Sequence, residues 1–197
     1  MAGFTWNETD TSSTNPAGTY CAPNGNGAAA LAFQCKQGGT AGGSHTTNNG
    51  STTVKQGLIY YQSNPGALDN LVLAAGTWQV QIDVTSTGSN SFTLAEIDIC
   101  HLNASGTSVG VIASSTPGTN INAVQTFTFS LTGVQTTFGI NETFMVCLLF
   151  TCNTASLRSL TFKNDVTITS PGAQVATPVV APYGGAPAST YGQPVIQ

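Results

Sequence analysis

The segment Thr77–Val84 restricts the fold of this chain more than any other stretch. It alternates strictly between polar and apolar residues, and its apolar members are Trp78, Val80, Ile82 and Val84. A period of two over this length indicates a β-strand with one buried and one solvated face. β-branched and aromatic residues favour that conformation. Further strands are needed to cover the buried face, so we expect an all-β protein.

Further strand-like segments follow at short intervals between turn signals. They cover residues 57–62, 71–73, 92–102, 109–113, 126–131, 143–152 and 160–168. The apolar parity shifts by one position within residues 92–102, which predicts either a β-bulge or a strand that changes faces. Residues 143–152 are apolar almost throughout and predict a central strand that is buried on both faces. This spacing of strands and turns predicts an antiparallel, jelly-roll-like β-sandwich.

Composition divides the chain into three parts. Residues 1–56 are rich in Gly, Asn and Thr and predict an extended N-terminal arm. Residues 57–170 hold the strand-like segments of the sandwich domain. Residues 171–197 form a Pro-rich C-terminal tail without a charged residue. We expect the arm to become ordered by lying across its own domain or a neighbour, the alternative being a flexible tail or a decorated loop. The C-terminal tail either threads over a partner or is disordered.

Charge is unusually scarce in this chain. Lys and Arg together number 4 and Asp and Glu 8, so 6% of residues are charged where about 25% is usual. The surface must be neutral and polar. It is either covered by other subunits or adapted to its medium as a neutral soluble domain. The net charge of −4 argues against nucleic acid as a partner.

The sequence also bears on where the chain is made and kept. No apolar run reaches the roughly 18 residues of a membrane span, and the N-terminus has neither a basic nor an apolar signal region. We therefore expect a chain that is made and kept in a cytosol, or that leaves the cell by lysis.

The cysteines are odd in number and lack the spacing of a zinc or redox motif. Cys100, Cys147 and Cys152 lie in strand-like segments, where buried thiols behave as small apolar residues. Cys21 and Cys35 flank a loop rich in Gly and Ala. This pair either stays reduced or forms a disulfide once the chain is outside the cell.

No residue set predicts catalysis, a metal site or a cofactor. The motifs of nucleophilic hydrolases, zinc proteases and phosphate loops do not occur. His45 and His101 stand alone, and we expect each to be structural or solvated. Asp83, Glu96 and Asp98 lie near strand faces but lack the closely spaced oxygen ligands of a calcium loop. His101 has the opposite parity to Glu96 and Asp98, so these side chains should diverge.

Five segments in a fixed order carry a family resemblance. They are Leu-Ala-Ala-Gly-Thr-Trp-Gln-Val at 73–80, Leu-Asn-Ala-Ser-Gly-Thr at 102–107, the alternating strand at 126–131, the apolar strand after an Asn-Glu turn at 138–150, and Arg-Ser-Leu-Thr-Phe at 158–162. In this order the chain resembles a β-sandwich module of tailed-bacteriophage virion structural proteins, over about half its length. The long arm, the Pro-rich tail and the cysteines depart from that pattern. The resemblance implies a capsid decoration or head-fibre protein, or a tail appendage.

Together these observations predict a non-enzymatic virion structural protein, a capsid decoration or cement protein that binds neighbouring capsid subunits. We expect a homo-oligomer, with a trimer as the first guess. The alternative is a tail or fibre module that recognises cell-surface glycan through a shallow groove with exposed aromatic residues. A third reading, a secreted cellular adhesin, is disfavoured by the lack of a signal region. The expected assembly contacts are the aromatic residues of the two extensions, Phe4, Trp6, Tyr20, Phe33, Tyr183 and Tyr191.

Overall fold

The computed structural model describes residues 3–12, 31–37, 44–49, 56–86, 92–152 and 158–175. Side chains are described for residues 3–7, 62–84, 92–152 and 167–173 within these ranges. All regular elements in the described segments are β-strands, so the all-β prediction is confirmed. No helix among these residues is long and apolar enough to cross a membrane.

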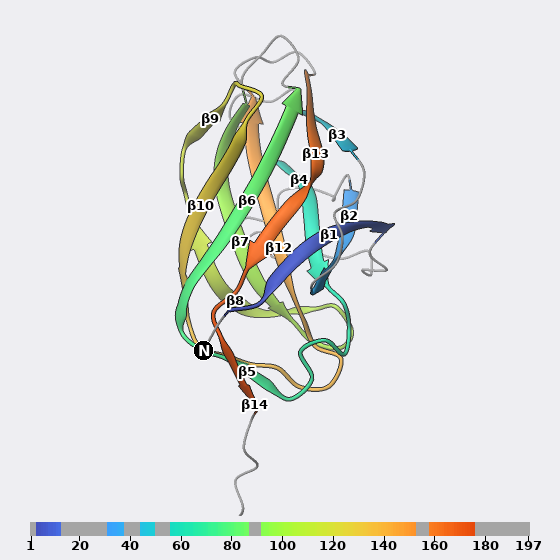
Figure 1. Ribbon diagram of the computed structural model, residues 1–197, viewed down its shortest axis with the longest axis vertical. Helices are drawn as coiled ribbons and strands as arrows, with labels where there is room; N and C mark the ends of the chain where they lie inside the picture. The colour runs from blue at the N-terminus through green and yellow to red at the C-terminus, as the bar shows by residue number, and fades with distance from the viewer. Residues whose placement is uncertain are drawn as a thin grey trace, which may run out of the picture.

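Eight strands form two layers that face each other (Figure 1). The front layer has the strand order β1 (Thr5–Ser12), β13 (Arg158–Thr169), β6 (Gly76–Ser86) and β10 (Thr126–Gly133). The back layer has the order β4 (Gln56–Ser63), β12 (Thr143–Cys152), β7 (Phe92–Leu102) and β8 (Ser108–Ser115). This order, with every pair inside a layer antiparallel, is that of a jelly roll and confirms the predicted sandwich.

Shorter strands join and extend the layers. One side of the sandwich is bridged by β2 (Leu31–Gln37), which pairs antiparallel with β1 and parallel with β4. The front layer is extended by β3 (Ser44–Asn49) on β13, and the back layer by β9 (Thr119–Ile121) on β7. A small separate sheet lies at the lower end in Figure 1 and consists of β11 (Thr136–Thr137), β5 (Leu71–Leu73) and β14 (Ala173–Val175).

The core lies between the two layers and includes the apolar side of β6. Trp78, Val80, Ile82 and Val84 are all buried in it, as the alternation predicts. Across from them, β12 contributes the even-numbered side chains from Phe144 to Phe150. Because a period of two places alternate residues on one face, both strands present a continuous apolar row to the core.

Two finer predictions about the back layer are confirmed. The partners of β7 shift by one residue, because Glu96 pairs with Leu149 while Leu94 pairs with Phe150. This shift is the predicted β-bulge, and it leaves Ala95 without a directly opposite residue. Strand β12 is buried on both faces from Thr143 to Phe150, since the odd-numbered residues of this stretch are as inaccessible as the even-numbered ones.

The segment expected to be an arm supplies strands to the sandwich. Strand β1 lies inside the front layer between β13 and β2, so the layer begins at Thr5 rather than at residue 57. Trp6 has no exposed surface and contacts Phe144 edge to face, with ring centroids 5.1 Å apart. A side chain that is buried within its own chain cannot contact a neighbouring subunit, so the prediction that Trp6 is an assembly contact is wrong.

We predict that Trp6→Ala destabilises the sandwich by about 3–5 kcal/mol, because a fully buried Trp is replaced by a cavity between the layers. Urea unfolding of the full-length chain measures the loss. Phe4→Ala is the matched control: Phe4 is only partly buried at the rim of the core, so its loss should stay below about 2 kcal/mol. An unchanged free energy of unfolding for Trp6→Ala would show that β1 does not belong to the folded domain.

Candidate functional site

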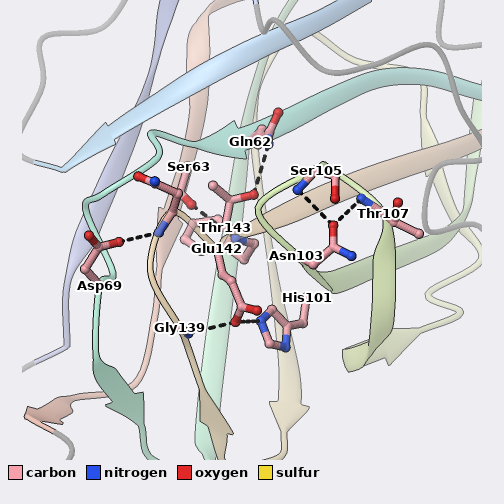
Figure 2. A network of polar contacts seen from close by, with 12 residues as sticks. Gln62, Ser63, Asp69, His101, Asn103, Ser105, Thr107, Gly139, Glu142 and Thr143 are labelled. Atoms are coloured by element: carbon pink, nitrogen blue, oxygen red, sulfur yellow. Dashed lines mark hydrogen bonds and ion pairs between the residues drawn. The ribbon is translucent and has the colours of Figure 1, made fainter.

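Three loops meet at the lower end of the sandwich (Figure 2). They are residues 64–70 between β4 and β5, residues 103–107 between β7 and β8, and residues 138–142 between β11 and β12. A hydrogen bond joins the first loop to the third, the third also bonds the end of β7, and the second is closed by bonds within itself. This end therefore gathers polar side chains from several parts of the sequence in a network of polar contacts.

Glu142 is the centre of the network. Its Oε2 atom accepts a hydrogen bond from the backbone N–H of Gly139 at 2.7 Å and one from Nε2 of His101, also at 2.7 Å. The His101 ring packs on Phe138 with centroids 4.7 Å apart. The Gly139 N–H is the main reason why the pKa of Glu142 is below its usual value; burial opposes the shift, and the His101 hydrogen bond and charge add to it.

A second carboxylate fixes the tip of the same loop. Asp69 Oδ1 accepts the backbone N–H of Asn141 at 2.7 Å, which joins the loop before β12 to the loop before β5. Asn141 has a φ of 59° and Asn70 a φ of 57°, a conformation that Asn tolerates better than most residues. The Asn-Glu turn predicted from the sequence is therefore a strained turn, and a distant carboxylate stabilises it.

Neutral polar groups fix the remaining strand ends. The Gln62 amide donates to the Thr143 hydroxyl at 2.9 Å, and the Ser63 hydroxyl accepts the Phe144 N–H at 3.1 Å. These bonds are buried and hold the start of β12 against the end of β4. In the predicted turn after β7, Asn103 Oδ1 accepts the N–H groups of Ser105 and Thr107, which is an Asx turn.

The carboxylates of the network hold the backbone of the end loops, because both accept backbone N–H groups. His101 packs towards the core side of β7, whereas Glu96 and Asp98 lie on the outer face, so the three diverge as the strand parity predicts. Among the described residues, no group of three His, Cys, Asp or Glu side chains converges as metal ligands do.

The outer face of the back layer carries a buried thiol beside a buried carboxylate. Cys100 and Asp98 alternate with the core residues Ile97 and Ile99, and both are fully buried. Burial, and secondly the Asp98 carboxylate, raise the pKa of Cys100 to about 12, against a smaller opposing effect of a hydrogen bond with Ser108. At neutral pH Cys100 is therefore a thiol and a poor nucleophile.

The cysteine predictions are confirmed in part. Cys100 and Cys152 take part in no disulfide and are buried, as expected. Cys147 is buried, but the expectation that it is a reduced thiol is wrong, because it is disulfide-bonded. Disulfide pairing depends on how distant strands come together, which spacing does not reveal. Of the pair predicted earlier, Cys21 lies outside the described residues, and Cys35 lies in β2 without a described side chain.

The predicted assembly contacts fall mostly beyond the described side chains. Phe4 is partly buried and packs edge to face on Trp6, with centroids 6.5 Å apart. Phe33 belongs to β2, where only the backbone is described, and the residues that lie outside the described part of the chain are Tyr20, Tyr183 and Tyr191.

A set of exposed apolar residues escaped the sequence analysis. Among the described side chains, the large exposed hydrophobic residues are Val109, Val111, Val124, Val134 and Ile140. All five are aliphatic, and all lie between Asp98 and Glu142, a segment without a single Asp, Glu, Lys or Arg. This uncharged segment of the sequence is the signal that could have indicated an exposed apolar region. The composition of the whole chain does not reveal it, because it does not show where the charged residues lie.

No protein-family model matches the chain, and no curated protein matches it. Among solved structures, it is similar to a CocE/NonD family hydrolase from Staphylococcus aureus, with 10% identity and a TM-score of 0.47 over 68% of this chain and 34% of that one. It is also similar to an α-amino acid ester hydrolase, with 12% identity and a TM-score of 0.41 over 57% of this chain and 25% of that one.

An aminopeptidase from a marine sediment Thaumarchaeota archaeon gives 9% identity and a TM-score of 0.41, over 59% of this chain and 25% of that one. The chain thus spans about a third or less of the length of these proteins. Likenesses of this size carry no argument about activity.

We predict that Glu142→Gln lowers the free energy of unfolding at pH 7 by about 1 kcal/mol, because charged hydrogen bonds become neutral ones. The folded-state pKa of Glu142 lies below 4.5, so its contribution is complete above about pH 5 and disappears as the pH falls through the folded-state pKa. Urea unfolding at pH 7 and at about pH 3 should therefore show a difference between variant and wild type that shrinks in acid. A difference of equal size at both pH values would contradict the assigned role.

We predict that peptide mapping without reduction finds Cys147 in a disulfide with Cys21 or Cys35, because Cys100 and Cys152 take part in no disulfide. Iodoacetamide should leave Cys100 and Cys152 unmodified in the native chain and label both after unfolding, because both thiols are buried. Recovery of a peptide that joins Cys21 to Cys35 would contradict this pattern and support the pairing predicted from sequence.

Proposed function

We propose that this chain is a non-enzymatic virion structural protein, a capsid decoration or cement protein that binds neighbouring capsid subunits. The observation that carries the proposal is that carboxylates are buried or used in internal hydrogen bonds, although the chain has few charged residues. Jelly rolls serve as viral capsid and lectin domains, among others. A fold does not imply a function, so the argument rests on the surface.

Burial removes two of the five described carboxylates from the surface, and the other three are held by hydrogen bonds although they remain partly exposed. Glu96 and Asp98 are buried on the outer face of the back layer. Asp69 and Glu142 are committed to backbone N–H groups in the end loops, and Asp83 accepts the Thr126 hydroxyl. Surface charge normally keeps a monomer soluble and protects its sheet edges. Because Glu96 and Asp98 are buried, the surface of this chain carries even fewer charged groups than its composition indicates.

A surface of this kind suits a permanent position among other subunits. Neutral polar groups form hydrogen bonds that salt screens weakly, and aliphatic side chains gain from burial at about 25 cal/mol per Å². The rigid sandwich supplies the platform, because its two layers and its end loops are fixed by internal contacts. Attachment to a shell would then depend on shape and apolar contact rather than on charge.

We predict that the chain is present in gradient-purified particles of the virus that encodes it and absent from particles made without its gene. Added back as the full-length protein, it should bind the depleted particles saturably. Its occupancy should change little between about 0.05 and 1 M NaCl, because few charges take part. Quantitative mass spectrometry of the particles measures occupancy.

Two outcomes would contradict the proposal. Absence of the chain from purified particles would contradict the virion role. Loss of binding at high salt would contradict the proposal that uncharged groups make the contact. Electron microscopy of labelled chain separates shell from tail, and a label at the tail tip together with release by free sugar would instead support glycan recognition.

A further inference from the structure

We propose that the segment between β1 and β2, residues 13–30, docks on the outer face of the back layer and is tied there by a disulfide between Cys21 and Cys147. These residues lie outside the described part of the chain. The inference goes beyond the proposed function, and its tests need no viral particles. We call the docking region the outer β7–β12 face and define it by the side chains of Glu96, Asp98, Cys100, Met145, Cys147 and Leu149.

The outer β7–β12 face is buried although it points away from the core. Its members alternate along their strands with core residues such as Ile99 and Val146, and each is at most 6% exposed. Antiparallel sheets commonly leave the face opposite the core in contact with water. The described strands all belong to the two layers, to their edges and the bridge between them, or to the small lower sheet. None of them forms a third layer over this face, so a part of the chain beyond the described strands must lie on it.

The disulfide of Cys147 identifies that part of the chain. Cys147 is disulfide-bonded, and neither Cys100 nor Cys152 takes part in a disulfide. Because the chain has 5 cysteines, the partner is Cys21 or Cys35. Cys147 belongs to the outer β7–β12 face, so its bond leads away from the core. The partner cysteine must therefore reach the outer side of the back layer.

The strand register excludes Cys35. On β4, Tyr60 is paired with Cys147 of β12 on one side and with Ala32 of β2 on the other. Ala32 is therefore level with Cys147 and two strand spacings away, roughly 10 Å. Cys35 lies three residues further along β2, which adds roughly 10 Å along the strand. The two Cα atoms are thus roughly 14 Å apart, about twice the distance that a disulfide spans, and Cys21 remains as the partner.

The segment can reach this site from the strand that follows it. Leu31, the first residue of β2, pairs with Ile59, and Ile59 pairs with Leu148, the neighbour of Cys147. The start of β2 is therefore only roughly 10 Å from β12 within the sheet. The ten residue steps from Cys21 to Leu31 span up to about 33 Å. This length allows the segment to leave β2, cross β4 and lie on the outer side of β12.

The composition of the segment suits the face that it would occupy. Residues 13–30 contain no Asp, Glu, Lys or Arg, whereas Ser, Thr and Asn are frequent. Hydroxyl, amide and backbone N–H groups donate hydrogen bonds to buried carboxylates such as those of Glu96 and Asp98, which would repel an acidic segment. Tyr20 and the alanines at 28–30 supply apolar contact area. Tyr20, expected from the sequence to be an assembly contact, would then pack on its own domain.

Formation of the cross-link is an oxidation. The Cys21 and Cys147 thiols lose two protons and two electrons as their sulfur atoms form one bond. A small disulfide such as oxidised glutathione accepts both and becomes two thiols. Disulfides form and persist in oxidising surroundings, so the cross-link forms once the chain has left the reducing cytosol.

The first test is the disulfide map of the full-length native chain after incubation with oxidised glutathione. The chain is then denatured, its remaining thiols are blocked with N-ethylmaleimide, and it is digested with pepsin in acid, where disulfides do not exchange. Leu31 and Phe33 provide cleavage sites between Cys21 and Cys35. We expect mass spectrometry to find Cys21 linked to Cys147, and Cys35 blocked. A link between Cys35 and Cys147, a link between Cys21 and Cys35, or no link at all would each overturn the proposal.

The second test asks whether the segment docks on the outer β7–β12 face. Cys21→Ser removes the cross-link, and the rate at which native Cys100 reacts with N-ethylmaleimide reports the exposure of that face. We expect this rate to rise at least about tenfold, because the burial that raises the pKa of Cys100 to about 12 is reduced. Cys152 belongs to the core and should stay unreactive.

Cys35→Ser is the matched control, because it removes a cysteine near the segment but leaves the cross-link intact. It should react at Cys100 like the wild type. An unchanged rate at Cys100 in Cys21→Ser, or a rise that Cys35→Ser reproduces, would overturn the docking of the segment on this face. The map of the wild type decides the cross-link even if Cys21→Ser fails to fold.

Discussion

The rest of the structure depends on the packing of Phe144 between two tryptophans, Trp6 and Trp78. Its ring lies 5.1 Å from that of Trp6 and 5.2 Å from that of Trp78, nearly perpendicular to both, a geometry that adds about 0.5–1.5 kcal/mol per pair to the burial itself. One residue of the back layer thereby joins β1 and β6 of the front layer. Neither indole N–H has an acceptor among the described residues. Each buried N–H without an acceptor costs about 1–3 kcal/mol of stability, so apolar packing must outweigh that cost.

The same cluster shapes the edge of the sandwich. A Cβ atom at Gly133 would lie 2.6 Å from both Cδ1 and Nε1 of Trp78, so any larger residue would displace the indole or the end of β10. The next residue, Val134, donates its N–H to Ile112 on β8. Core packing therefore decides where β10 ends and how closely it approaches β8, and the exposed aliphatic side chains at that edge follow from it.

What the sequence could predict was local. The alternation of β6, the bulge in β7 and the two-sided burial of β12 are patterns within one strand, and each was predicted correctly. The place of β1 was not predicted, because Thr5–Ser12 has a single large apolar residue and its partner Ile168 lies at the other end of the chain. The bonds of Glu142 with His101 and of Asp69 with Asn141, and the disulfide of Cys147, likewise depend on loops and strands that meet only in the folded chain.

The use of the carboxylates links the interior to the surface. A chain with so few charges still commits Asp69 and Glu142 to backbone N–H groups and buries Glu96 and Asp98. Acidic groups therefore stabilise turns, and burial withdraws Glu96 and Asp98 from a surface that has few charges to begin with. Because long-range charge steers association and separates like-charged molecules, both effects are weak on a surface with few charges. Shape and apolar area must then decide what this sandwich binds and how closely its copies approach one another.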